Sequence, residues 1–137
     1  MVEKVQNPLP NSYMENEYVE LWEEEGIIYE KFKPQTVLNM EAGRKVVEDR
    51  MKLSNKRVMP LLVDIKNLVS VDVQTRRWMA TEEALAYLSA GAFIINNTLT
   101  RLFFNTFLKL DKPKIPTRGF PNESKALIWL EHYKRVN

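Results

Sequence analysis

Residues 58–77 read VMPLLVDIKNLVSVDVQTRR, and this stretch decides how the rest of the chain is arranged. Its first half is a nearly continuous apolar run that ends at Asp64, which predicts a central β-strand covered on both faces. Asp72 then begins a helical pattern that runs to about residue 79, with the aspartate at the N-cap position. The stretch therefore predicts a strand, a short loop and a helix.

The N-terminal part of the chain divides into a polar arm and a hairpin. Residues 1–16 contain two prolines and show no hydrophobic period, so we expect a mobile arm ahead of a single domain that spans residues 17–137. Two β-rich runs, residues 18–23 and 27–32, flank a turn that ends in Gly26. Such runs around a glycine predict an antiparallel hairpin.

Helix and strand patterns alternate through the rest of the chain. Asn39 is the predicted N-cap of a helix that ends near residue 54, in which Val46, Val47 and Arg50 fall at helical spacing. Gly43 in that helix predicts close packing on the sheet. After the opening stretch we expect a kink near Thr81 or a short second helix to about residue 88. Further on we expect a buried strand over 90–95, a helix over 99–110 capped by Thr98, an edge strand within 114–120, and a last helix capped by Asn122.

This element order defines the predicted fold class, which is α/β. An N-terminal antiparallel hairpin is followed by helix–strand crossovers, and the helices pack on a layered sheet. The 137 residues suit one domain of this kind.

Composition and charge exclude several classes of function. The 20 basic and 18 acidic side chains give a net charge of +2, which is too balanced for a general nucleic-acid binder. No stretch approaches 18 apolar residues, so we expect no membrane-spanning segment, and the first residues do not have the pattern of a signal peptide. The chain has no cysteine, which fits a reducing compartment, and we expect a cytoplasmic protein.

No catalytic, metal-binding or cofactor-binding motif is recognisable in the sequence. The one histidine, His132, lies in the last predicted helix and is expected at the surface. Asp64 and Asp72 are two carboxylates, but no nucleophile or oxyanion stabiliser accompanies them in a recognisable arrangement. We therefore predict a protein that is not an enzyme and that needs neither a metal nor a cofactor.

The first candidate site lies where the parallel strands end. Ligands of open α/β sheets bind outside the carboxyl ends of the strands. The alternative is a structural role, in which Asp72 and Thr98 cap helices and Asp64 accepts hydrogen bonds from its loop or pairs with Lys66. The candidate residues for a partner or ligand are Asp64, Asp72, Thr75, Asn97 and Thr98.

The second candidate site is the apolar side of the predicted helix 99–110. Phe103 and Phe107 lie on its main stripe, whereas Phe104 and Leu108 lie off the stripe. If Phe104 and Leu108 are exposed together, they form an apolar patch typical of an interface. The same aromatic helix can instead line a pocket for a small apolar ligand, or belong to an ordinary core.

The residues also resemble a known family. Leu61-Leu62-Val63-Asp64 followed by Val71-Asp72 is similar to the central pattern of STAS domains, in which an apolar strand ends in aspartate and a second aspartate begins a helix. The resemblance extends over residues 17–135 and points to small bacterial STAS-like proteins of unassigned function, related to the sporulation anti-sigma-factor antagonists. Further similarities are Phe-Lys-Pro at 32–34, Ala-Phe-Ile-Ile at 92–95, Phe-Leu-Lys-Leu at 107–110, Pro-Thr-Arg-Gly-Phe at 116–120 and Trp-Leu at 129–130.

The sequence departs from the regulatory STAS pattern after Asp72. Regulatory members have serines there, one of which is phosphorylated, and then a glycine. Here Val73 and Gln74 follow the aspartate, and Thr75 is the nearest hydroxyl. A phosphate on Thr75 would meet the positive end of a helix and two following arginines, which makes Thr75 a hypothetical modification site.

The resemblance and the missing catalytic motifs lead to two functional hypotheses. The first is a regulatory or protein-interaction module that binds a protein partner or a second copy of itself. The alternative is a carrier or sensor of a small apolar, lipid-like ligand held beside the helix 99–110.

Overall fold

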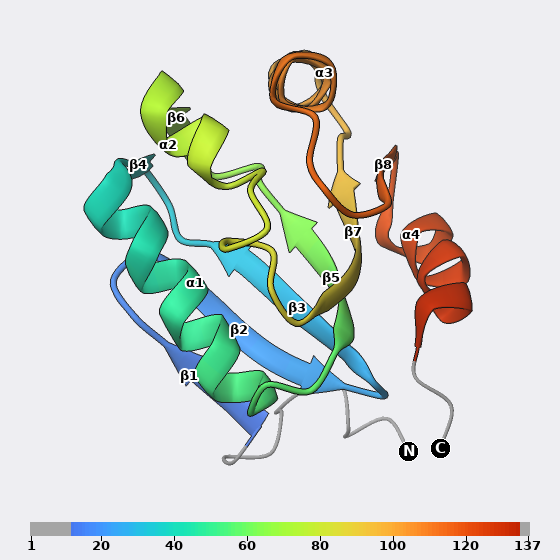
Figure 1. Ribbon diagram of the computed structural model, residues 1–137. Helices are drawn as coiled ribbons and strands as arrows, with labels where there is room; N and C mark the ends of the chain where they lie inside the picture. The colour runs from blue at the N-terminus through green and yellow to red at the C-terminus, as the bar shows by residue number, and fades with distance from the viewer. Residues whose placement is uncertain (1–11, 135–137) are drawn as a thin grey trace.

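Six strands form one mixed sheet in the computed structural model, which describes residues 12–134 (Figure 1). The order across the sheet is β1-β2-β3-β5-β7-β8. The pairs β1/β2 and β2/β3 are antiparallel, and the remaining pairs are parallel. The strands are β1 (Tyr13–Glu15), β2 (Val19–Glu24), β3 (Ile27–Phe32), β5 (Met59–Asp64), β7 (Leu88–Ile94) and β8 (Thr117–Phe120).

The predicted hairpin, central strand and edge strand are confirmed, and the start of the sheet differs from the prediction. Strand β1 lies within the residues that we assigned to the mobile arm. It pairs with β2, and Tyr13 lies opposite Trp22. The rest of the predicted arm, residues 1–11, lies outside the described residues.

Two short strands that the sequence analysis missed form a second, parallel sheet. Strand β4 (Thr36–Leu38) pairs with β6 (Leu68–Val71). Strand β6 occupies part of the segment that we predicted as a loop after Asp64. Strands of three or four residues carry too few positions for a period of two to be visible.

The helices lie on both faces of the large sheet (Figure 1). On one face, Ala42 and Val46 of α1 pack with Leu61 and Val63 of β5. On the other face, Leu130 of α4 packs with residues that include Leu62 of β5. The helical segments are α1 (Met40–Ser54), α2 (Val73–Trp78), α3 (Thr98–Thr106), the π-helical turn η3 (Phe107–Asp111), α4 (Glu123–Leu130) and the 3₁₀ turn η4 (Glu131–Tyr133).

Two predictions about the middle of the chain are wrong. Residues 81–87 form turns and not the short second helix, which was one of the two alternatives predicted for this segment. Arg50 fixes the segment by donating a hydrogen bond from Nη2 to the carbonyl of Ala84. Gly43 marks a close approach to α2 rather than to the sheet, since a Cβ on Gly43 would lie 3.0 Å from Thr75 Cγ2. Both errors have one cause: contacts between distant segments decide these positions.

The predicted orientation of α3 is also wrong. Asn97, not Thr98, is the N-cap, and it forms a capping box with Thr100. Phe104 is buried, whereas Leu99 of the predicted stripe is 77% exposed. Apolar residues of this helix occur on all of its sides, so periodicity alone does not select the buried face. The contact between the rings of Phe104 and Phe93 selects it.

Within the described part of the chain, no helix is both long enough and apolar enough to cross a membrane.

The corrected orientation of α3 predicts unequal effects of two apolar truncations. Phe104→Ala should lower the free energy of unfolding by about 3–5 kcal/mol, because it leaves a cavity against Phe93. Leu99→Ala, on the exposed side, should change it by less than about 0.5 kcal/mol. Urea denaturation measures both values, and equal losses would contradict the orientation described here.

Candidate functional site

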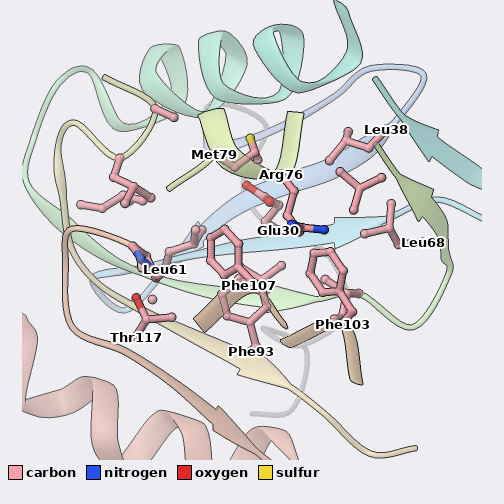
Figure 2. Close-up of a pocket in the computed structure, with 18 of the residues that line it drawn as sticks. Glu30, Leu38, Leu61, Leu68, Arg76, Met79, Phe93, Phe103, Phe107 and Thr117 are labelled. Carbon is pink, nitrogen blue, oxygen red and sulfur yellow. The ribbon is translucent and has the colours of Figure 1, made fainter. Parts of the chain in front are cut away.

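An apolar cavity lies between the large sheet and the segments that cover its α1 face. Its wall includes β3, β5 and β7 below and α2, α3 and the 81–87 turns above, and water-sized groups can occupy about 60 Å³ of it. Figure 2 shows the lining side chains, with Phe93, Phe103 and Phe107 gathered on one side. Protein interiors are close-packed as a rule, and this cavity is an open space within such an interior.

Gly91 helps to keep the cavity open. It lies in the middle of β7 opposite Leu61, and it lines the cavity. A Cβ placed on Gly91 would meet no heavy atom within 4 Å. Its backbone is not in the left-handed region, so a residue with a side chain fits the conformation as well. The absence of a side chain at Gly91 therefore contributes to the open space over the centre of the sheet.

Three phenylalanines form the aromatic wall of the cavity. The rings of Phe103 and Phe107 are stacked, with centroids 6.2 Å apart, and the Phe93 ring lies 5.7 Å from that of Phe107. Phe103 comes from α3, and Phe107 begins η3. Of the predicted apolar candidates, Phe103 and Phe107 thus line the cavity, Phe104 is buried beside it, and Leu108 lies on the exposed side.

A buried ion pair interrupts the apolar lining. Glu30 of β3 and Arg50 of α1 are each 3% exposed, and Arg50 Nη1 lies 3.7 Å from Glu30 Oε1. Strand alternation places Glu30 on the α1 face, between the inward-facing Ile28 and Phe32. Burial raises the pKa of the Glu30 carboxyl, and the charge of Arg50 opposes this rise. Burial lowers the pKa of the Arg50 guanidinium, which Glu30 opposes in turn.

A second ion pair lies above the cavity. Arg76 of α2 lines the cavity and donates a hydrogen bond from Nε to Asp111 Oδ2 at 2.6 Å. The Asp111 side chain is itself almost fully buried. In Figure 2 the Glu30 and Arg76 side chains both point into the cavity, which they line together with Met79. The charged groups that face the cavity are therefore already paired within the protein.

The predicted site at the strand ends is a set of hydrogen-bonded caps and turns. Asp64 accepts a hydrogen bond from the backbone N–H of Lys66, and Asp72 accepts one from the N–H of Thr75. Hydrogen bonding from Thr75 lowers the pKa of the Asp72 carboxyl. Asn97 caps α3, and Thr98 is exposed at its first position. Asp64, Asp72 and Asn97 therefore accept local hydrogen bonds, and none of the five candidates lines the cavity.

Thr75 has a different environment from the one that its modification would need. Its side chain is fully buried against Gly43 of α1. The hydroxyl is buried in the folded chain, so a kinase would need the segment to open before it could reach Thr75. The hypothesis of phosphorylation at Thr75 has no support in this geometry.

A groove on the surface adjoins the cavity. It runs between β6 and the start of α3, and Val69, Leu99 and Leu102 beside it are 63%, 77% and 62% exposed. Asn97 lines it, and it is the one strand-end candidate that does so. Phe103 lines both the groove and the cavity.

Among residues 12–134, no three or more histidine, aspartate or glutamate side chains converge as a group that could hold a metal ion.

The arrangement of strands and helices defines a fold that is already known. A crystal structure of an uncharacterised DUF3478-family protein from Shewanella loihica PV-4, described as having a SpoIIAA-like fold, matches with a TM-score of 0.58 and 15% sequence identity. The match covers 85% of this chain and 98% of that one. The expected resemblance to STAS-like proteins is therefore confirmed at the level of the fold.

The sequence itself places the chain in a family. Residues 21–134 match the domain of unknown function DUF7793, and the chain belongs to this family. No curated protein matches the sequence. The function must therefore be argued from the cavity and the surface of this chain.

Sequence reasoning found part of the cavity and missed its charged and open parts. Phe103 and Phe107 were candidates from their spacing, but Glu30, Arg50 and Gly91 were not. Two signals were present. Glu30 lies between Ile28 and Phe32 at a spacing of two residues, which places all three on the same face of a strand. Arg50 falls on the apolar stripe of its helix. A charged residue at an apolar position of each element predicts a buried pair.

The ion pair predicts a strongly non-additive double-mutant cycle. Glu30→Leu alone should lower the free energy of unfolding by about 3–5 kcal/mol, because it leaves the charge of Arg50 buried without a partner. Glu30→Leu combined with Arg50→Leu should restore stability close to that of the unmodified protein. Denaturation of the four proteins at neutral pH measures the coupling, and additive effects would refute the pair.

The other single variant should depend on pH. In Arg50→Leu the buried Glu30 has no cation, so its raised pKa makes the folded state bind a proton more tightly than the unfolded state does. Stability should therefore fall as the pH rises above about 4.3, the usual pKa of glutamate. Thermal unfolding of Arg50→Leu between acidic and neutral pH tests this direction, with the double variant as the control.

Proposed function

We propose that the protein is a non-enzymatic binding module that holds a small, largely apolar molecule in the cavity between the sheet and α2, α3 and η3. One observation carries this proposal: the centre of the sheet is left open at Gly91 and faced by Phe93, Phe103 and Phe107. Ligand sites are typically apolar, with a few polar groups at set positions. Glu30, Arg50 and Arg76 would provide those polar groups.

The role of such a module is that of a sensor or a carrier. The family has no assigned function, and the relative of known structure is described as uncharacterised, so both roles rest on the cavity of this chain. The proposal includes a cytoplasmic location, because a chain without cysteine suits a reducing compartment.

Filling the cavity should block binding without damaging the fold. Gly91→Val places two methyl groups in open space and replaces a weak strand residue, so the midpoint of thermal unfolding should rise. Toluene, added as an apolar probe, should bind the unmodified protein and shift the methyl resonances of cavity residues, and Gly91→Val should reduce this binding at least tenfold.

Leu99→Ala provides the matched control for this experiment, since Leu99 is exposed and does not line the cavity. It should bind toluene as the unmodified protein does. Failure of toluene and other apolar probes to bind the unmodified protein would refute the proposed function, as would equal binding by Gly91→Val.

The surface groove favours a second candidate function, which is protein interaction. Exposed apolar residues that adjoin one another are typical of interfaces, and Val69, Leu99 and Leu102 gather beside one groove. The partner would be another protein or a second copy of this chain. Such an interface is consistent with the regulatory role that the resemblance to STAS domains implies.

A test on a second copy requires only the purified protein. If the groove is a self-association surface, the unmodified chain should form dimers at increasing concentration, and Leu99→Lys with Leu102→Lys should remove them. Ile128→Lys is the matched control, because Ile128 is equally exposed but lies on α4. Sedimentation velocity measures the distribution, and a strict monomer at all concentrations would exclude self-association.

A further inference from the structure

Two buried carboxylate oxygens near the cavity have no hydrogen-bond partner among the described residues. They are Glu30 Oε1, in the wall of the cavity, and Asp111 Oδ1, on the residue that pairs with Arg76. No buried side-chain nitrogen of residues 12–134 is in the same condition. A buried acceptor without a hydrogen bond is energetically unfavourable. A ligand in this region would therefore be stabilised by donating a hydrogen bond to one of these two oxygens.

The arginines of the cavity are already engaged by acceptors of the protein. Arg50 donates from Nη2 to the Ala84 carbonyl, and its Nη1 lies 3.7 Å from Glu30 Oε1, which is beyond hydrogen-bonding distance. Arg76 donates to Asp111. An incoming carboxylate would compete for these guanidinium groups and would place a second anion beside Glu30.

The charges around the cavity balance. Glu30 and Arg50 oppose one another, and so do Arg76 and Asp111. A charged ligand would therefore add an uncompensated charge to a buried space, which is strongly unfavourable. An uncharged ligand avoids this cost, and an apolar body matches the aromatic wall.

We propose that the cavity selects a small uncharged molecule with an apolar body and one hydroxyl group, a phenol or a short alcohol, whose hydroxyl hydrogen-bonds to Glu30 Oε1. This inference rests on the proposed ligand-binding function and adds the chemical class of the ligand. Glu30 acts as the group that recognises the hydroxyl, and Phe93, Phe103 and Phe107 contact the apolar body.

A hydroxyl suits Glu30 in both of its protonation states. It donates to the carboxylate, and it accepts from the neutral carboxylic acid. This adaptability matters because burial and Arg50 act on the carboxyl in opposite directions. An ammonium group would lie close to the guanidinium of Arg50, and a methyl group would leave Glu30 Oε1 without a hydrogen bond. The space of about 60 Å³ is smaller than a cavity of about 150 Å³ that binds benzene, so an aromatic ring must move the surrounding side chains or lie partly outside the cavity.

The experiment compares three aromatic probes: phenol and toluene, which match in size, and the larger anion benzoate. Binding to isotope-labelled unmodified protein is followed by NMR titration. Phenol should bind about tenfold more tightly than toluene, the effect of one satisfied hydrogen bond, and benzoate should bind most weakly. Transfer from water alone favours toluene, since phenol must give up its hydration, so the expected order is the reverse of simple apolar binding.

The double variant Glu30→Leu with Arg50→Leu separates recognition from the shape of the cavity. It should still bind toluene, and the preference for phenol should disappear. The order of the three probes in the unmodified protein decides the inference even if this variant does not fold. Toluene binding as tightly as phenol, or benzoate binding most tightly, would overturn the proposed ligand class and leave the proposed function intact. No binding by any probe would refute the proposed function itself.

Discussion

The buried pair of Glu30 and Arg50 is the constraint that links the layers of this protein. Glu30 belongs to β3, near the centre of the sheet, and Arg50 belongs to the last turns of α1. Arg50 also holds the carbonyl of Ala84, so one guanidinium connects the sheet, the helix and the turns that lead into β7. Any packing of α1 that separated these groups would leave a charge buried without a partner. The position of α1 on the sheet is therefore set by electrostatics as well as by apolar contact.

The same pair explains how an open space persists in an otherwise packed layer. Apolar cores close around small vacancies, because side chains gain dispersion contacts when they approach one another. Here the side of the cavity near α1 is held by paired charges, and Arg76 is held by Asp111. Gly91 removes the side chain that would occupy the middle. The cavity therefore combines a missing side chain with lining residues that are held by ion pairs.

The features that the sequence predicted are those that depend on local physics. The hairpin around Gly26, the buried run before Asp64 and the cap at Asp72 each have a signal within a few residues. The missed features depend on distant contacts: Ala84 is fixed by Arg50, and the buried face of α3 by Phe93. The cavity was predicted only in part. Two of its phenylalanines follow from helical spacing, whereas the role of Gly91 depends on what lies opposite it in three dimensions.

The cavity and the surface groove, on which the two candidate functions rest, lie next to each other. The cavity and the surface groove share four lining residues, which are Ile65, Leu68, Val71 and Phe103. A molecule in the cavity would contact the same side chains that shape the groove, and a partner in the groove would press on them from outside. Any difference in their position between the empty and the occupied cavity changes the affinity for both, because such coupling is reciprocal. At the corner where regulatory STAS domains carry a phosphorylated serine, this chain buries Thr75 under α1. If the cavity binds a small molecule as proposed, that molecule would contact side chains that also line the surface groove next to α3.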